Sequence, residues 1–252
     1  MSGADDSVPN DTGSDTAFVD AVAARVATAR SRIDTVAPDP SSVRLVAVTK
    51  GFGPQAVRAA LAAGVSDIGE NYADELVGKA DRLAASGPPG GAPPPRWHFL
   101  GAIQRNKVAR LAPLVDWWQS VSRIEEGRAI ARRRPGASVL VQVDVVGGQG
   151  RNGCRPADVA DLVRTLADED LDVAGLMTVG PHGPPETARP GFALVRDLAA
   201  RLELAQCSMG MTDDMDVALA EGSTMIRLGR ALFGDRPARP RLSPGPPGPT
   251  GR

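Results

Sequence analysis

The sequence places a lysine at the end of a segment that has the pattern of a buried strand. Residues 45–53 read LVAVTKGFG, so Lys50 follows a run rich in β-branched residues, and two glycines break the pattern at once. A lysine in this position is either a boundary residue whose charged head reaches water or a reactive amine in a pocket. This stretch alone leaves both interpretations open.

Other residues with binding chemistry lie at or just beyond the ends of later predicted strands. Two glycine-containing turns, SMGM (208–211) and LGR (228–230), offer backbone N–H groups of the kind that bind phosphate. A buried guanidinium on an apolar strand needs a partner, so Arg227 is difficult to explain as a packing residue. The candidate binding residues, together with Lys50, are Asn71, His98, Met177, Ser208, Met211, Arg227, Gly229 and Arg230.

Several of these residues also have a purely structural explanation. His98, between Trp97 and Phe99, suits a core histidine as well as a ligand contact. Methionines at these positions more often pack than bind. The individual residues therefore leave the alternatives open, and the case for a site comes from their combination.

The elements that would position these residues alternate along the chain. A helix is predicted over about 16–35, and after it strands and helices take turns; one of these helices is predicted over 106–115, and ALFG (231–234) is expected as a short apolar tail after the last strand. The predicted strands are 43–48, 66–68, 97–101, 116–121, 138–145, 171–177, 205–210 and 224–229. Eight such units predict a closed (β/α)₈ barrel, in which binding groups lie at the C-terminal ends of the strands. A Rossmann fold is disfavoured because TKGFGPQ, after the first strand, lacks GxGxxG.

Composition predicts one barrel domain between two disordered ends. The 252 residues are 42% hydrophobic and 23% charged, which allows a full-sized core. The acidic start, 1–15, and the Pro/Gly-rich end, 236–252, predict a disordered arm and tail, with the barrel over 16–235. Two internal Pro/Gly-rich segments, 86–95 and 180–191, are interpreted as loops within the barrel.

Charge and cysteine content restrict the class of protein. A net charge of −1 argues against a nucleic-acid-binding role. The sequence has neither an apolar run of 18 residues nor the layout of a signal peptide, so we expect a cytoplasmic protein that does not enter a membrane. Cys154 and Cys207 lack metal-ligand spacing, and no metal site is expected; both are interpreted as free thiols.

The candidate residues taken together indicate one ligand. A lysine across the barrel mouth from two phosphate-binding turns suits a phosphorylated aldehyde, which points to pyridoxal 5′-phosphate held as a Schiff base. At the level of motifs the chain resembles the pyridoxal phosphate homeostasis protein family, barrel proteins related to the N-terminal domain of alanine racemase. The motifs are AVTK, IGENYADE, WHFLGAIQRNK, VQVD, GLMTVG and SMGMTDDMDVALAEGSTMIRLGRALFG, within residues 18–235.

The resemblance implies a role for each candidate residue. Lys50 would carry the cofactor. The phosphate would be held by Ser208 and by the backbone of Gly229 and Arg230, while Arg227 would face the pyridine nitrogen. The ring pocket would be lined by Asn71, His98, Met177 and Met211.

Three positions depart from the family pattern. Thr212 stands where serine is usual and keeps the hydroxyl. Residues 151–153 are Arg-Asn-Gly, where the family usually has Lys-x-Gly after the fifth strand. A secondary role of an amine at this position is therefore in doubt. Arg230 is bulkier than the residue that is usual at this position. Its backbone could still contact the ligand, but it has no side-chain hydroxyl to do so.

An arginine against the pyridine nitrogen still serves racemases that have a second base on the opposite face of the substrate; because only a predicted disordered tail follows the barrel, we expect a cofactor carrier rather than a committed enzyme. Arginine only donates, so the nitrogen would stay unprotonated and the ring would be a weak electron sink. The implied role is intracellular cofactor homeostasis by a monomer, with apo-enzymes that need pyridoxal phosphate as recipients. The alternatives are a low-activity racemase or related enzyme, with Lys50 on one face of the substrate and Tyr72 or His98 on the other, and a structural barrel that merely retains the pocket.

Overall fold

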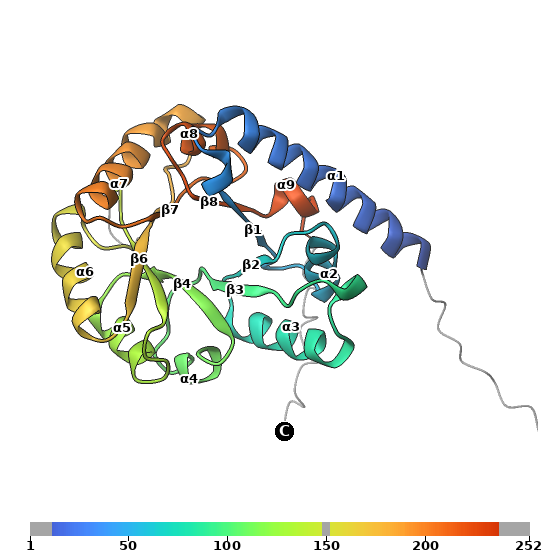
Figure 1. Cartoon of the computed structure of the whole chain (residues 1–252), viewed down its shortest axis with the longest axis horizontal. Helices are drawn as coiled ribbons and strands as arrows, with labels where there is room; N and C mark the ends of the chain where they lie inside the picture. Colours follow the sequence, from blue (N-terminus) through green and yellow to red (C-terminus); the bar gives the residue numbers. More distant parts are fainter. Residues whose placement is uncertain (1–11, 148–151, 237–252) are drawn as a thin grey trace, which may run out of the picture.

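Eight parallel strands close into a barrel in chain order within the residues that the computed structural model describes, 12–147 and 152–236, with side chains from residue 16 (Figure 1). Strand β8 pairs with β1 and completes the ring. The expected (β/α)₈ fold is therefore confirmed. The strands are β1 (Arg44–Val48), β2 (Asp67–Glu70), β3 (Arg96–Phe99), β4 (Val115–Val121), β5 (Ser138–Gln142), β6 (Asp172–Met177), β7 (Gln206–Ser208) and β8 (Met225–Leu228).

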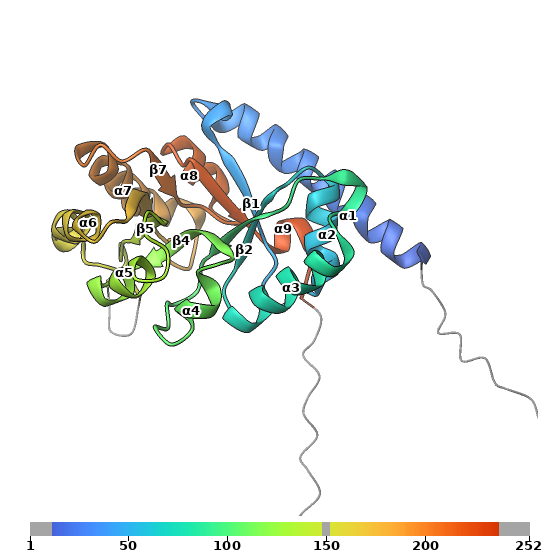
Figure 2. The same ribbon diagram turned by 60° about the horizontal axis from the view of Figure 1, so that its bottom comes forward.

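Helices surround the strands, as Figure 2 shows from the side. None of the described helices combines the length and the apolar character that crossing a bilayer requires. The helices are α1 (Thr12–Val36), α2 (Pro54–Ala62), α3 (Ala73–Ser86), α4 (Val108–Leu111), α5 (Ile124–Ala131), α6 (Val159–Asp168), α7 (Arg189–Arg201), α8 (Met215–Ala220) and α9 (Arg230–Phe233). Short 3₁₀ helices lie at Pro40–Ser42, Pro89–Gly91, Pro156–Asp158 and Pro185–Ala188.

Helix α1 lies outside the ring and packs against α2, α8 and α9 (Figure 1). Its buried residues, Val22, Val26, Ala29 and Ile33, recur every three or four positions and so form one apolar face. The helix begins at Thr12, inside the segment that the sequence assigns to the disordered arm. The rest of that arm and, apart from Arg236, the predicted tail lie outside the described residues.

Alternation along the strands creates two apolar cores. Outward-facing residues such as Ala47 pack against the helices, whereas Val46, Leu140, Met177 and Met225 form a separate cluster inside the barrel. Successive side chains of a strand point to opposite faces. Because of this alternation, residues 46 and 48 of β1 point into the barrel, and Lys50, two residues further on, lies on the inner side of the barrel mouth.

Two helical segments differ from the sequence-based expectation. The helix predicted over 106–115 shortens to α4, because Pro113 cannot continue a helix. The segment ALFG, expected as an apolar tail, contributes to α9, whose Phe233 packs on Phe52 with ring centroids 5.2 Å apart. Cys154 and Cys207 are buried free thiols, as expected.

A buried ion pair attaches α3 to the ends of β1 and β2. Lys79 Nζ donates to Glu70 Oε1 at 2.5 Å and to the carbonyl of Thr49 at 2.8 Å, and the Thr49 hydroxyl donates to the same carboxylate at 2.6 Å. Glu75, also on α3, accepts from the N–H of Gly51 at 2.8 Å. The residues on both sides of Lys50 are therefore held by α3.

Replacing Lys79 with methionine should lower the free energy of unfolding by about 3–5 kcal/mol, because Glu70 would remain buried without its partner. Lys107→Met is the matched control. Lys107 pairs with Asp74 at an exposed site, so its loss should cost less than about 1 kcal/mol. Urea unfolding of both variants measures the difference. Equal losses in the two variants would contradict the structural role assigned to the buried pair.

Candidate functional site

A cavity of about 280 Å³ opens at the C-terminal ends of the strands. It collects residues that follow β1, β2, β6, β7 and β8, so segments far apart in the sequence contribute to one site. Seven of the nine predicted binding residues line it: Lys50, Asn71, Met177, Met211, Arg227, Gly229 and Arg230.

Lys50 is the lysine that lines this cavity. The chain contains three lysines; Lys79 is held in the buried pair with Glu70, and Lys107 pairs with Asp74 on the surface. Partial burial lowers the pKa of Lys50 below its usual value, and the charges of Arg236 and Arg227 lower it further, against the opposing effect of Glu70. A lowered pKa increases the fraction of neutral, nucleophilic amine near pH 7.

Arg227 forms the inner wall of the cavity. It lies on β8 with its side chain inside the barrel, is 4% exposed, and donates to the Ser208 hydroxyl and the Thr178 carbonyl, both at 2.7 Å. Burial lowers its pKa to about 10, and the nearby Asp214 opposes that shift. The guanidinium therefore stays charged at neutral pH and acts only as a hydrogen-bond donor.

Positive charge dominates the described lining of the cavity. Lys50, Arg227, Arg230 and Arg236 contribute four cations, and Asp213 contributes the carboxylate. Asp213 is partly neutralised, because it accepts a hydrogen bond from Arg230 at 3.1 Å. The cavity therefore suits an anionic ligand.

Glycines shape the two turns that close the cavity. Gly210, after β7, has φ +92°, and a Cβ at this position would come 2.4 Å from the Cβ of Ala218. In this turn the N–H of Met211 already donates to Asp214 at 2.6 Å. After β8, Gly229 leads into α9; the N–H groups of Leu232 and Phe233 donate to the Gly229 carbonyl, whereas those of Arg230 and Ala231 come too early in the helix to find an acceptor inside it. Of the two turns, the one after β8 is the better placed to receive an anion.

Asn71 presents an unsatisfied acceptor. Within the part of the chain that the structure describes, its side-chain oxygen is buried and has no hydrogen-bond partner. Its backbone is fixed by the chain after β3, since a Cβ at Gly101 would come 1.9 Å from the Asn71 carbonyl oxygen. A buried polar atom without a partner at a cavity wall indicates a missing donor.

His98 and Ser208, which the resemblance placed in direct contact with the ligand, do not line the cavity. Both are completely buried in the barrel interior. His98 is bonded through both ring nitrogens, to Asp67 and Gln119, and stacks on Trp117. Alternation turns these two side chains inward, away from the cavity lining, and their contact with a ligand stays a prediction. For His98, the core interpretation left open by the sequence agrees with the structure.

Other cavity residues carried no clear signal in the sequence. Arg236 was assigned to the disordered tail, and His182 belongs to a Pro/Gly-rich loop, yet both line the cavity. Thr212 also lines it. Tyr72, considered as a second base, is 50% exposed and lines a separate hollow with Asp74 and Phe99. Arg151, one of the departures from the family pattern, lies outside the described residues.

The comparisons with known proteins agree with this geometry. The chain is 38% identical over 224 residues to a pyridoxal phosphate homeostasis protein of Pseudomonas aeruginosa, a match that covers 85% of this chain and 93% of the relative. A protein of the same name from Escherichia coli is 31% identical over 232 residues, covering 85% and 97%.

A solved structure shares the fold at similar identity. PipY of Synechococcus elongatus, without pyridoxal phosphate, superposes with a TM-score of 0.74 at 32% identity, covering 84% of this chain and 100% of PipY. The structure of PipY with pyridoxal phosphate bound gives a TM-score of 0.72. The family model described as the alanine racemase N-terminal domain matches residues 19–237. The chain therefore belongs to the alanine racemase N-terminal domain family and, within it, to the pyridoxal phosphate homeostasis proteins.

Proposed function

We propose that this protein binds pyridoxal 5′-phosphate through Lys50 and takes part in intracellular cofactor homeostasis as a carrier. The observation that carries the proposal is a partly buried amine of lowered pKa in a cavity that otherwise presents mainly guanidinium groups. Curated relatives bear the homeostasis name, and the PipY structure was obtained with this cofactor bound.

The residues of the cavity fit the cofactor. A phosphate dianion would offset the excess of positive charge and could be received by the turn at Gly229 and Arg230. Arg227 would donate to the pyridine nitrogen, and Asn71, whose side-chain oxygen has no partner within the described residues, would lie beside the ligand. Met177 and Met211 contribute apolar surface beside the ring. When bound, the cofactor supplies an electron-withdrawing ring; the protein supplies the amine and the donors.

Arg227 favours a carrier over a committed enzyme. A donor-only group opposite the pyridine nitrogen does not protonate it, so the ring withdraws electrons weakly. The two second bases considered for a racemase lie elsewhere: His98 is bonded on both nitrogens, and Tyr72 lines a separate hollow. His182 does line the cavity and could serve as a base. An assay of α-proton exchange therefore decides between a carrier and a racemase.

Lys50→Ala should abolish covalent attachment while the barrel stays folded, because the amine lies at the barrel mouth. The measurement is borohydride reduction of the cofactor-loaded protein, followed by mass mapping of peptides containing Lys50, Lys79 and Lys107. Lys107→Ala is the control and should label like the natural protein. A modified peptide that contains Lys79 or Lys107 would refute the assignment.

Arg236→Gln should move the pH profile of attachment to higher pH. Arg236 lowers the pKa of Lys50, so its neutralisation raises that pKa and leaves less neutral amine at a given pH. Stopped-flow absorbance of cofactor uptake across a pH series measures the profile. Arg58→Gln, on α2 and bonded to Ser86 and Gly87, serves as the control. An unchanged profile, or a shift to lower pH, would contradict this prediction.

The carrier proposal predicts transfer without turnover. Loaded protein, eluting as a monomer of 26.2 kDa, should pass its cofactor to an apo-enzyme that requires pyridoxal phosphate. The same protein should exchange the α-protons of L-amino acids in D₂O no faster than free cofactor does. Rapid exchange that is lost in His182→Asn would establish the racemase alternative instead, and failure to reactivate any apo-enzyme would exclude the carrier role.

A further inference from the structure

A series of buried side chains connects the cofactor cavity to the opposite end of the barrel. Arg227 donates to the Ser208 hydroxyl at 2.7 Å, and Ser208 contacts Gln119 Oε1 at 2.6 Å. Gln119 Nε2 lies 2.6 Å from His98 Nδ1, and His98 Nε2 lies 2.9 Å from Asp67 Oδ1. We call these five residues the interior network; each is 5% exposed or less.

The two ends of the network determine where every proton lies. Arg227 can only donate, so the Ser208 oxygen accepts and its own proton goes to the amide oxygen of Gln119. Although burial raises the pKa of Asp67, hydrogen bonds from His98 and Arg96 lower it to about 2, so the carboxylate is charged and can only accept. His98 Nε2 therefore carries the proton, and His98 Nδ1 accepts from Gln119.

The resulting hydrogen bonds all point in one direction. Each link has its donor on the side of Arg227 and its acceptor on the side of Asp67, so the bond dipoles align between a buried cation and a buried anion. Aligned hydrogen bonds in a low-dielectric interior strengthen one another. In the described structure the direct acceptors of Arg227 are a hydroxyl and a carbonyl, and Asp214 acts on it through space; the network adds a hydrogen-bonded connection to Asp67.

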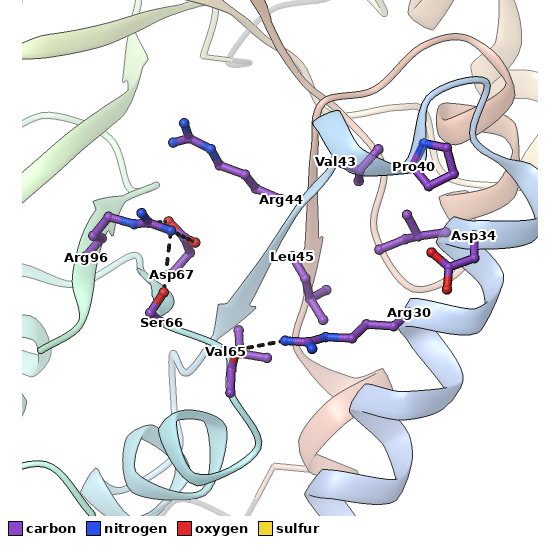
Figure 3. Close-up of a pocket in the computed structure, with 12 residues that line it drawn as sticks. Arg30, Asp34, Pro40, Val43, Arg44, Leu45, Val65, Ser66, Asp67 and Arg96 are labelled. Carbon is purple, nitrogen blue, oxygen red and sulfur yellow. Dashed lines mark hydrogen bonds and ion pairs between the residues drawn. The ribbon is translucent and has the colours of Figure 1, made fainter. Parts of the chain in front are cut away.

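The far end of the network lies at a second cavity. About 390 Å³ in volume, this cavity opens at the N-terminal ends of β1, β2 and β3. Figure 3 shows Asp67 bound there by Arg96, whose Nε donates at 2.9 Å, with Arg44 nearby. The charged groups that act on His98 are Asp67, Arg44 and Arg96, and burial lowers the pKa of His98, which keeps the imidazole neutral.

We infer that Ser208, Gln119, His98 and Asp67 are positioning residues that hold Arg227 toward the cofactor cavity, with Asp67 as the fixed acceptor at the far end of the series. This inference rests on the proposed function, since Arg227 is the residue proposed to meet the pyridine nitrogen. It also gives Ser208 a role other than phosphate contact: the hydroxyl orients the arginine from below the cavity floor.

The test compares Asp67→Asn and Gln119→Leu with Asp116→Asn. Asp116 is a carboxylate at the same end of the barrel that accepts from the Trp97 N–H and lies outside the network. Asp67→Asn keeps an acceptor for His98 but removes the charge, and Gln119→Leu breaks the series in the middle. Both should weaken cofactor retention about 2- to 30-fold, the range typical of residues that act through others, and should shift the absorption and emission of the bound cofactor.

The control should retain the cofactor within about twofold of the natural protein, with superimposable spectra, because its carboxylate does not reach Arg227. Identical retention and spectra in all three variants would overturn the inference. If Asp67→Asn does not fold, Ser208→Ala replaces it, since it removes only the hydroxyl next to Arg227, and the same outcomes apply.

A second readout uses the cofactor-free protein. The chain has two histidines, so ¹⁵N spectra of the imidazoles are readily assigned with His182→Gln. Because burial lowers its pKa, His98 should be neutral near pH 7, with its proton on Nε2. A proton on Nδ1 would overturn the network. Should the natural protein take up no pyridoxal phosphate, the proposed function fails, while this measurement still decides whether the network exists.

Discussion

A guanidinium enclosed in a barrel must find acceptors there, and much of this interior follows from that constraint. Arg227 is almost completely buried, and an unpaired charge at such a site would be prohibitively costly. The barrel interior accordingly contains two sets of side chains. Val46, Leu140, Met177 and Met225 form an apolar cluster, and a series of polar residues leads from Arg227 to Asp67.

The cavity above this interior combines groups that repel one another. Lys50, Arg227, Arg230 and Arg236 share one opening, and burial together with the charges of Arg236 and Arg227 lowers the pKa of the lysine. Functional sites commonly concentrate such perturbed groups. A bound phosphate would relieve the repulsion, so the arrangement favours a ligand that brings its own negative charge. The backbone on both sides of Lys50 is held in place, because Thr49 and Gly51 each form a hydrogen bond with a side chain of α3.

The sequence predicted the barrel, and seven of the nine candidate binding residues that it indicated line one cavity. Alternating strands and helices indicated eight units, and residues at strand ends included Lys50, Asn71 and Arg227, which line the cavity. The sequence could not give the direction in which a side chain points. His98 and Ser208 lie on strands that approach the site, but their side chains bond within the interior. Arg236 was missed because its Pro/Gly-rich surroundings resemble a tail.

By itself, the sequence determined the alternation of strands and helices, because this depends on local periodicity. It also determined that Lys50 follows directly after a strand and which residue types are available at the barrel mouth. Only the tertiary structure decided which polar residues meet. The contacts of the interior network join residues 19, 89, 21 and 31 positions apart. Such pairs depend on the register of neighbouring strands, and register is set by closure of the whole barrel, which no local segment encodes.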